Sequence, residues 1–277
     1  MYRATTFICL LLLSAVAPAW STLQDWASVV ATQIKAKQPL PVLSAYGASL
    51  NLLDAYAIQK LVVQNLGEGD HVAGFKAALT RPRGQVEFNV REPVTGVILN
   101  NGLLRGEITL RLRDFKRLTI APALGFVLKA RVNRPLTDLT QLAPLIGAVM
   151  PVIDFSDFRF ERETGLSATD LVAGNVAFAR LLVGKPFAAM DPATIDGVLV
   201  ELSHNDTVVD RGRAINVMGS QQTALFWLIN KILAQGWKLP KGTLLVTGGL
   251  SDPVRARPGR YHTKFWGATD LRFIVER

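Results

Sequence analysis

Short segments with the pattern of β-strands recur along most of this 277-residue chain, and they restrict the folds that it can adopt. The clearest one covers residues 107–113, where Ile108, Leu110 and Leu112 alternate with charged or polar residues. This alternation is typical of a strand that buries one of its faces. Further strands, separated by turn residues, are predicted at 72–79, 85–90, 94–99, 124–132, 149–160, 198–204, 207–210, 243–247 and 263–276.

Three longer segments, 22–38, 51–66 and 220–235, have the spacing of amphipathic helices. In the first of them one face collects the apolar residues Leu23, Trp26, Val30 and Ile34. A short helix is expected at 138–145, and 168–170 opens either a helix or a loop.

Together these elements predict the α+β class. No repeat or linker divides the chain, so we expect one domain over 22–277. It should have a helical N-terminal part at 22–80 and a strand-rich body at 81–277.

Residues 1–21 have the three parts of a secretory signal peptide. Arg3 precedes a mostly apolar run at 7–17, and Ala17 and Ala19 form a small-residue cleavage motif. A bilayer span needs about 20 apolar residues, which is more than this run offers. We therefore expect cleavage near residues 19–21 and a periplasmic or secreted mature protein. The alternative is an uncleaved anchor or a buried core helix.

Cysteine and histidine usage excludes two classes of site. The single cysteine, Cys9, lies inside the expected signal peptide, so a disulfide framework is excluded. The three histidines, His71, His204 and His262, have no metal-ligand spacing, which argues against a zinc site.

The formal net charge is +9. Basic residues gather in two groups, Arg105, Arg111, Arg113, Lys116 and Arg117 in one and Arg255, Arg257 and Arg260 in the other. Few aromatic residues lie between them and no nucleic-acid-binding module is present, so no nucleic-acid partner is predicted. An anionic ligand or envelope surface is the better partner. A simply solvated basic face remains the alternative.

The chemical motifs are weak when they are taken singly. The sequence has no nucleophile elbow, no phosphate-binding loop and no dinucleotide fingerprint. Lys76 stands out because small and apolar residues surround it in 74–80. A partly buried lysine suits base catalysis, whereas a lysine on an edge strand would simply reach solvent.

Several segments from Asp54 onwards follow one another in a recognisable order: 54–59, 74–80, 93–96, 126–128, 151–154 with Asp157, Asn175 with Gly184, 224–230 and 241–248. This order resembles the 2-keto-4-pentenoate hydratase family of the fumarylacetoacetate hydrolase superfamily, which also includes the oxalocrotonate decarboxylases. This resemblance implies a mixed β-roll with a few helices, and dimers or larger homo-oligomers.

The same resemblance implies a magnesium or manganese site, built from a Glu-x-Glu pair on a strand and a third acid. The metal would chelate a 2-oxo acid and stabilise the enolate. Here the pair is replaced by Ala121 and Ala123, and the third position is Asp154. One carboxylate does not hold Mg²⁺ against water, so no metal cofactor is expected unless the correspondence is shifted and Glu107 or Asp114 supplies a ligand.

Other family positions also depart from the pattern. Gly174 stands where the family has Asp, Ala177 where it has Ser, and Arg260 where an acid is common. Lys76, Asp154, Asn175, Thr247 and Gly248 keep the pattern.

Three hypotheses follow. The first is a degenerate, metal-free protein that binds a small 2-oxo acid or another anionic ligand through a cation such as Lys76, Arg180 or Arg260, or that acts as a partner subunit. The second is a metal-independent lyase, with Lys76 and Asp154 as catalytic residues. In both, Asn175, Thr247, Gly248 and Arg260 are the ligand-binding candidates. The third is a non-catalytic envelope protein that uses its basic surface.

Overall fold

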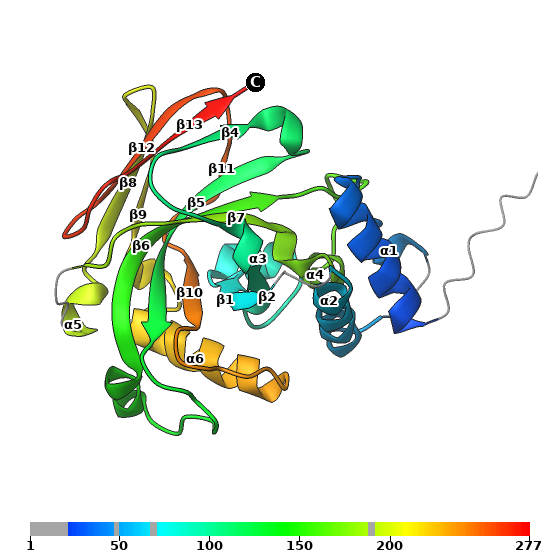
Figure 1. The fold of residues 1–277 in the computed structure, drawn as a ribbon, viewed down its shortest axis with the longest axis horizontal. Coiled ribbons are helices and arrows are strands. Elements are labelled where there is room, and N and C mark those ends of the chain that lie inside the picture. The colour runs from blue at the N-terminus through cyan, green and yellow to red at the C-terminus, as the bar shows by residue number, and fades with distance from the viewer. Residues whose placement is uncertain (1–21, 47–49, 67–70, 188–191) are drawn as a thin grey trace, which may run out of the picture.

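The computed structural model describes residues 22–46, 50–66, 71–187 and 192–277, arranged as helices around two β-sheets (Figure 1). The expected signal peptide at 1–21 lies outside the described residues. Within the described ranges, no helix has both the length and the apolar character needed to cross a membrane. The architecture is the mixed α+β arrangement that the sequence predicts.

The larger sheet has eight strands, in the order β2-β1-β10-β5-β6-β7-β3, with β11 paired to β5. Its strands are β1 (Val72–Ala78), β2 (Val94–Leu99), β3 (Leu103–Leu104), β5 (Leu118–Leu128), β6 (Ile146–Asp157), β7 (Phe178–Val183), β10 (Leu244–Gly249) and β11 (Val254–Arg255). Its two longest strands, β5 and β6, pair in antiparallel fashion along their length.

This sheet curls so strongly that β2, near one edge, contacts β7, near the other. One buried cluster collects apolar side chains from five of its strands: Ile98, Ala123, Met150, Val152, Leu181, Val183, Leu244 and Val246. Side chains from so many strands meet only on a concave face. We call this group the inner apolar cluster.

The smaller sheet has five strands, in the order β4-β13-β12-β8-β9. They are β4 (Ile108–Arg111), β8 (Leu199–His204), β9 (Thr207–Arg213), β12 (Gly259–Phe265) and β13 (Leu271–Glu276). The predicted hairpin at 198–210 is confirmed, and its turn residues Asn205 and Asp206 have positive φ angles. Asn and Asp tolerate this left-handed conformation better than most residues do.

Helices cover the sheets at two places. The helices are α1 (Leu23–Ala36), α2 (Leu52–Leu66), α3 (Pro82–Glu87), α4 (Ala168–Ala173), α5 (Pro192–Ile195) and α6 (Gln221–Ala234). The first two and α4 pack together through a separate apolar cluster, at the right of Figure 1. The N-terminal helical part therefore recruits α4 from the middle of the chain.

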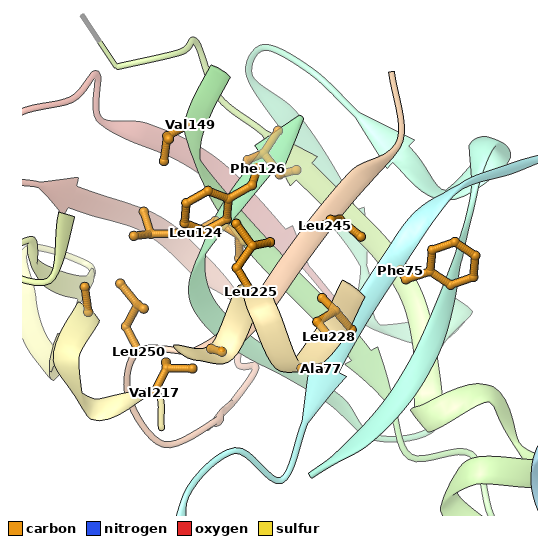
Figure 2. Packing of buried hydrophobic residues seen from close by; sticks show 14 of the residues in the cluster. Phe75, Ala77, Leu124, Phe126, Val149, Val217, Leu225, Leu228, Leu245 and Leu250 are labelled. Atoms are coloured by element: carbon orange, nitrogen blue, oxygen red, sulfur yellow. The ribbon is translucent and has the colours of Figure 1, made fainter. Parts of the chain in front are cut away.

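The main core lies on the other face of the larger sheet, between that sheet, α6 and the smaller sheet. Leu225 and Leu228 of α6 point toward Phe126, Leu245 and Ala77 of the sheet (Figure 2). Each fully buried side chain of this size stabilises the fold by about 1.5–3 kcal/mol. This packing fixes α6 against β10 and β1, two of the strands that carry the site described below.

Two predicted elements are wrong. Residues 85–90 were expected to be a strand, but 82–87 form helix α3 with Pro82 in its first turn, and Val86 is 81% exposed. Proline suits a first helical turn, and the side chain of Gln85 donates to the carbonyl of Leu79. The helix expected at 138–145 consists of two 3-10 turns, 139–141 and 143–145, and Pro144 lies in the second.

Two further boundaries differ. The strand expected at 124–132 begins at Leu118 and ends at Leu128. The strand expected at 243–247 runs on through Gly248 to Gly249, which pairs with Ala123.

Candidate functional site

Lys76 and Asp154 form an ion pair on the inner face of the curled sheet. The Nζ atom of Lys76 lies 2.6 Å from Oδ2 of Asp154 and donates a second hydrogen bond to Oγ of Ser156 at 3.0 Å. The side chain of Lys76 is 2% exposed and that of Asp154 is 16% exposed. The sequence-predicted catalytic pair is therefore brought together, with the cation enclosed and the carboxylate near solvent.

Local sequence explains why these side chains meet. Asp154 and Ser156 are two residues apart on β6, so their side chains share one face. Lys76 comes from β1, and its stem passes Gly96 of β2, where an added Cβ would lie 3.3 Å from Lys76 Cγ. The ring of Phe178 lies 5.9 Å from the ammonium group. Glycine on the neighbouring strand thus leaves the room that the lysine side chain occupies.

One atom of the pair has no partner. Oδ1 of Asp154 is buried and accepts no hydrogen bond. An unsatisfied buried acceptor costs about 1–3 kcal/mol, so such atoms mark places where water or a ligand group is accommodated. The ammonium of Lys76, by contrast, is engaged as a donor by both Asp154 and Ser156.

The residues beside Asp154 do not fit a magnesium or manganese ion. Ala121 is the register partner of Asp154, and Ala123, which is fully buried, pairs with Val152. Both side chains are methyl groups and offer none of the oxygen ligands that a hard cation needs. Across the described residues no group of three acidic, histidine or cysteine side chains converges.

The alternative ligands lie elsewhere. Asp114 follows β4 in the smaller-sheet region, and its carboxylate pairs with Lys37 of the N-terminal part at 3.2 Å. That hydrogen bond, aided by the nearby charges of Arg113 and Arg111, lowers the pKa of Asp114. Glu107 is exposed just before β4.

Asn175 is held by backbone groups. Its amide accepts from the N–H of Val97 at 2.7 Å and donates to the carbonyl of Val97 at 2.9 Å. Asn175, Val176 and Ala177 all have φ angles near +50°, a strained conformation for the β-branched valine. The amide extends the hydrogen bonding of edge strand β2, so its oxygen and its nitrogen each already have a backbone partner.

Thr247 and Gly248 lie at the end of β10. The hydroxyl of Thr247 donates to Oε1 of Gln221 at 2.5 Å, which joins β10 to the start of α6. Gly248 has a φ of +115°, and a Cβ there would meet Oγ1 of Thr80 at 2.7 Å. Both residues have evident structural roles at these positions.

Arg260 is exposed on β12 of the smaller sheet. Its backbone N–H donates to Asn205, and none of its described contacts reaches Lys76 or Asp154. The structure thus unites Lys76 with Asp154, while the described hydrogen bonds of Asn175, Thr247 and Arg260 go to other residues.

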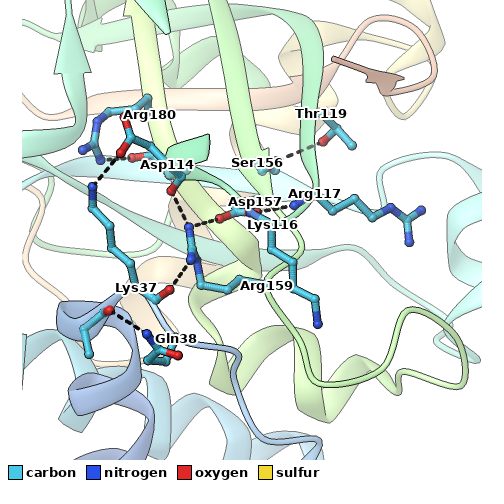
Figure 3. Close-up of polar contacts among 12 residues, drawn as sticks. Lys37, Gln38, Asp114, Lys116, Arg117, Thr119, Ser156, Asp157, Arg159 and Arg180 are labelled. Carbon is cyan, nitrogen blue, oxygen red and sulfur yellow. Dashed lines mark hydrogen bonds and ion pairs between the residues drawn. The ribbon is translucent and has the colours of Figure 1, made fainter. Parts of the chain in front are cut away.

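A larger open space lies outside this pair. A cavity of about 700 Å³ is enclosed by α1, β4, β7 and the segment after α4, and Arg180 and Asn175 are among its lining residues. Figure 3 shows its polar wall, in which Arg180, Lys37, Asp114 and Arg159 approach one another. Arg159 is 2.7 Å from Oδ2 of Asp157.

Sequence reasoning missed several polar residues of these two regions. Ser156 could have been found from its two-residue spacing to Asp154. The Asp157–Arg159 pair has the same spacing, and its carboxylate also accepts the backbone N–H groups of Lys116 and Arg117. Gln221 gives no sequence signal, because its partner Thr247 is 26 residues away.

Known proteins resemble this chain in sequence. No family model matches it. The 2-oxo-hept-4-ene-1,7-dioate hydratase of Escherichia coli is 23% identical over 249 residues, which is 87% of this chain and 93% of that protein. Further relatives are named 4-oxalocrotonate decarboxylase or 2-keto-4-pentenoate hydratase.

Solved structures share the fold. A 4-oxalocrotonate decarboxylase from Pseudomonas putida G7, complexed with magnesium and adipate, matches with a TM-score of 0.85 and 20% identity over 91% of this chain and 97% of that one. A fumarylacetoacetate hydrolase family protein of yeast matches with a TM-score of 0.54 and 12% identity over 73% of this chain and 92% of that one. The chain is thus similar in sequence to 2-keto-4-pentenoate hydratases and 4-oxalocrotonate decarboxylases and shares the fold of the fumarylacetoacetate hydrolase superfamily, which together support an assignment to that superfamily.

Proposed function

We propose that this protein is a hydratase-like protein without metal-dependent lyase activity, and that it binds a small anionic ligand. The observation that carries the proposal is the environment of Asp154. Its neighbours on β5 are Ala121 and Ala123, and its carboxylate is joined to Lys76. One carboxylate beside two methyl groups offers too few oxygen ligands to hold a divalent cation against water.

Packing on the same face supports the proposal. Ala123 belongs to the inner apolar cluster and is fully buried there, next to Val152. Because side chains occupy this space, a hydrated cation and a chelated substrate would need the cluster to open. The chemistry named for the relatives, hydration or decarboxylation of 2-oxo acids, is therefore proposed to be lost here.

A turnover assay tests this proposal. Purified protein is mixed with 2-hydroxypenta-2,4-dienoate, with 2-oxohept-4-ene-1,7-dioate or with 4-oxalocrotonate, with and without Mg²⁺ or Mn²⁺. We expect no metal-stimulated consumption of any of them. Metal-stimulated turnover that is abolished by Asp154→Ala would contradict the proposal.

A metal-independent lyase is the second candidate, and the observation that favours it is the unpartnered oxygen of Asp154. The unpartnered Oδ1 of Asp154, on a side chain that keeps some exposure, offers an acceptor to a substrate hydroxyl or to water. Against it, Lys76 donates to two oxygens and is poorly placed to accept a proton. Turnover in EDTA that disappears in Lys76→Ala would favour this candidate over the first.

The basic-surface hypothesis gains little support from the described contacts. Arg111 pairs with Glu276 at 3.8 Å, and the Lys116 ammonium donates to the carbonyl of Phe160. Arg117 lies over the ring of Phe158. Much of the first basic group therefore interacts with the protein itself.

Export is the remaining part of the proposal, because residues 1–21 have the composition of a signal peptide. Thr22, just beyond them, is the N-cap of α1 and exchanges hydrogen bonds with Asp25. Cleavage near 19–21 would leave this cap intact, so the fold tolerates removal of the signal.

A further inference from the structure

We infer that the 700 Å³ cavity beside α1 and β7 binds a small organic dianion with an apolar chain, of the dicarboxylate class, and that Arg180 is its main anchor. The inference deepens the proposed function, since it rests on the anionic character of the ligand. It places the ligand outside the Lys76–Asp154 pair, neither of whose members is among the residues lining this cavity.

The first argument is the charge of the wall. Every carboxylate that lines the cavity already has a cation, in the pairs Asp114–Lys37 at 3.2 Å, Asp157–Arg159 at 2.7 Å and Glu276–Arg111 at 3.8 Å. Two lining cations remain, Lys35 and Arg180, whose described side-chain hydrogen bonds go to backbone carbonyls. The wall thus has an excess of two positive charges, which an anion of two negative charges would balance.

The second argument is the geometry of Arg180. It projects from β7 and is partly buried, and one of its Nη atoms donates to the carbonyl of Ala179 at 2.7 Å. A guanidinium has five N–H donors, so several of them remain for a ligand. Its planar fork matches a carboxylate through two parallel hydrogen bonds. Lys35 is exposed at the rim and supplies a more mobile second charge.

The third argument is the chemistry of the rest of the wall. Ile34, Leu99, Leu110, Phe115 and Phe178 contribute apolar surface to the same cavity. Ligand sites in proteins occupy about 300–1,000 Å³ and combine apolar walls with a few placed polar groups. An inorganic anion would leave these apolar walls unused, whereas a dicarboxylate with a short hydrocarbon chain would cover them.

Isothermal titration of the full mature chain with adipate tests the inference. Hexane-1,6-diol serves as the neutral probe of the same length, and inorganic phosphate as the compact anion. We expect adipate to bind, and the diol and phosphate to bind at least about tenfold more weakly. Phosphate binding as tight as adipate binding would overturn the dicarboxylate assignment.

Variants locate the site. Arg180→Gln should weaken adipate binding about tenfold or more, Arg180→Lys should weaken it less, and Lys35→Gln should have a smaller effect. Arg83→Gln, at an arginine 83% exposed on α3, is the matched control and should bind like the parent chain. Equal losses in Arg180→Gln and Arg83→Gln, or none in either, would overturn the inference. Because Arg180→Lys keeps both charge and packing, it also guards against misfolding as the cause of lost binding.

The Lys76→Met variant separates this inference from the proposed function. We expect it to retain adipate binding. If Lys76→Met abolished binding while Arg180→Gln left it intact, the ligand would lie inside the curled sheet and the cavity assignment would be wrong. The proposed function would survive that result and would fail only on metal-dependent turnover.

Discussion

Lys76 is enclosed almost completely by protein, whereas its partner Asp154 keeps a small contact with solvent. Removing one member of a buried ion pair leaves the other charge without compensation. The two partners should therefore respond differently to substitution, because a carboxylate with some contact with solvent can recruit water and an enclosed ammonium cannot.

Asp154→Ala should lower the free energy of unfolding by about 3–5 kcal/mol, because it leaves the Lys76 ammonium buried and unpaired. Lys76→Met should cost less, and the double variant Lys76→Met/Asp154→Leu should recover most of the loss. Urea unfolding of all four proteins, analysed as a double-mutant cycle, measures these values. A larger cost for Lys76→Met than for Asp154→Ala would contradict this description of the pair.

Asp210 on β9 offers a test by pH. Its Oδ2 atom is buried without a partner, and desolvation, with a smaller contribution from the charge of Asp252, raises its pKa. An acid whose folded pKa is raised contributes stability below its unfolded pKa, and that stability is lost as pH rises through the folded value. At neutral pH the ionised Asp210 is therefore unfavourable.

Asp210→Asn should raise the melting temperature at pH 7, and the difference from the parent chain should shrink as the pH falls through the raised folded pKa of Asp210 and disappear below the unfolded value of about 4. Thermal unfolding followed by circular dichroism between pH 3 and 7 measures it. Asp206→Asn, in the turn before the same strand, is the control. A stabilisation by Asp210→Asn that is constant over this range would show that the carboxyl charge is not responsible.

Strand β5 shows how one element decides what the site can do. Its inner face presents Ala121, Ala123 and Gly125, and the last two are packed against neighbouring side chains. A Cβ on Gly125 would already lie 3.0 Å from Val152 and Leu244 side-chain atoms. The close packing of the inner apolar cluster therefore leaves room only for small residues at positions 123 and 125.

Ala123→Glu should consequently destabilise the protein by about 3–5 kcal/mol, because it buries an uncompensated carboxylate among apolar side chains. Ala121→Glu, two residues earlier on the same face but partly exposed, is the matched comparison and should cost clearly less. Urea unfolding measures both losses of stability from the shift of the denaturation midpoint, provided that the dependence of the unfolding free energy on urea concentration is unchanged. Equal tolerance of the two substitutions would mean that the inner face holds open space.

Among the secondary-structure elements, the long amphipathic helices were easier to predict than the strands that rest on a short alternation of apolar and polar residues. The apolar stripe of 22–38 gave α1 within two residues at each end, because burial of one helix face leaves a strong periodic pattern. The alternation at 85–90 was misleading, since no neighbouring strand pairs with it and Pro82 starts a helix instead. Pairing partners are a property of the tertiary fold and leave no mark in so short a segment.

The same limit applies to the site. Family resemblance identified Lys76 and Asp154, but their hydrogen bond joins residues 78 positions apart, which spacing along the chain does not predict. Nor does it predict that the amide of Asn175 is used by the backbone of Val97, also 78 residues away. Residue types thus indicated a site, while tertiary contacts determine which groups remain available in it.

For the whole molecule, removal of the expected signal peptide would leave the first helix and its N-cap intact. Thr22 caps α1, and the carboxylate of Asp25 accepts from the Thr22 N–H. We predict that the protein recovered from the periplasm or medium begins between Trp20 and Thr22, as N-terminal sequencing or intact mass would show. Recovery of the full-length chain in the membrane fraction would instead support an uncleaved anchor.

We propose that this hydratase-like protein holds no catalytic metal. Titration of the chelator-treated mature protein with Mn²⁺, followed by the electron paramagnetic resonance signal of the free ion, measures it directly. We expect the signal to rise as it does in buffer alone, with no stoichiometric uptake at micromolar concentrations. Uptake of one Mn²⁺ per chain at micromolar concentration, lost in Asp154→Ala, would contradict it.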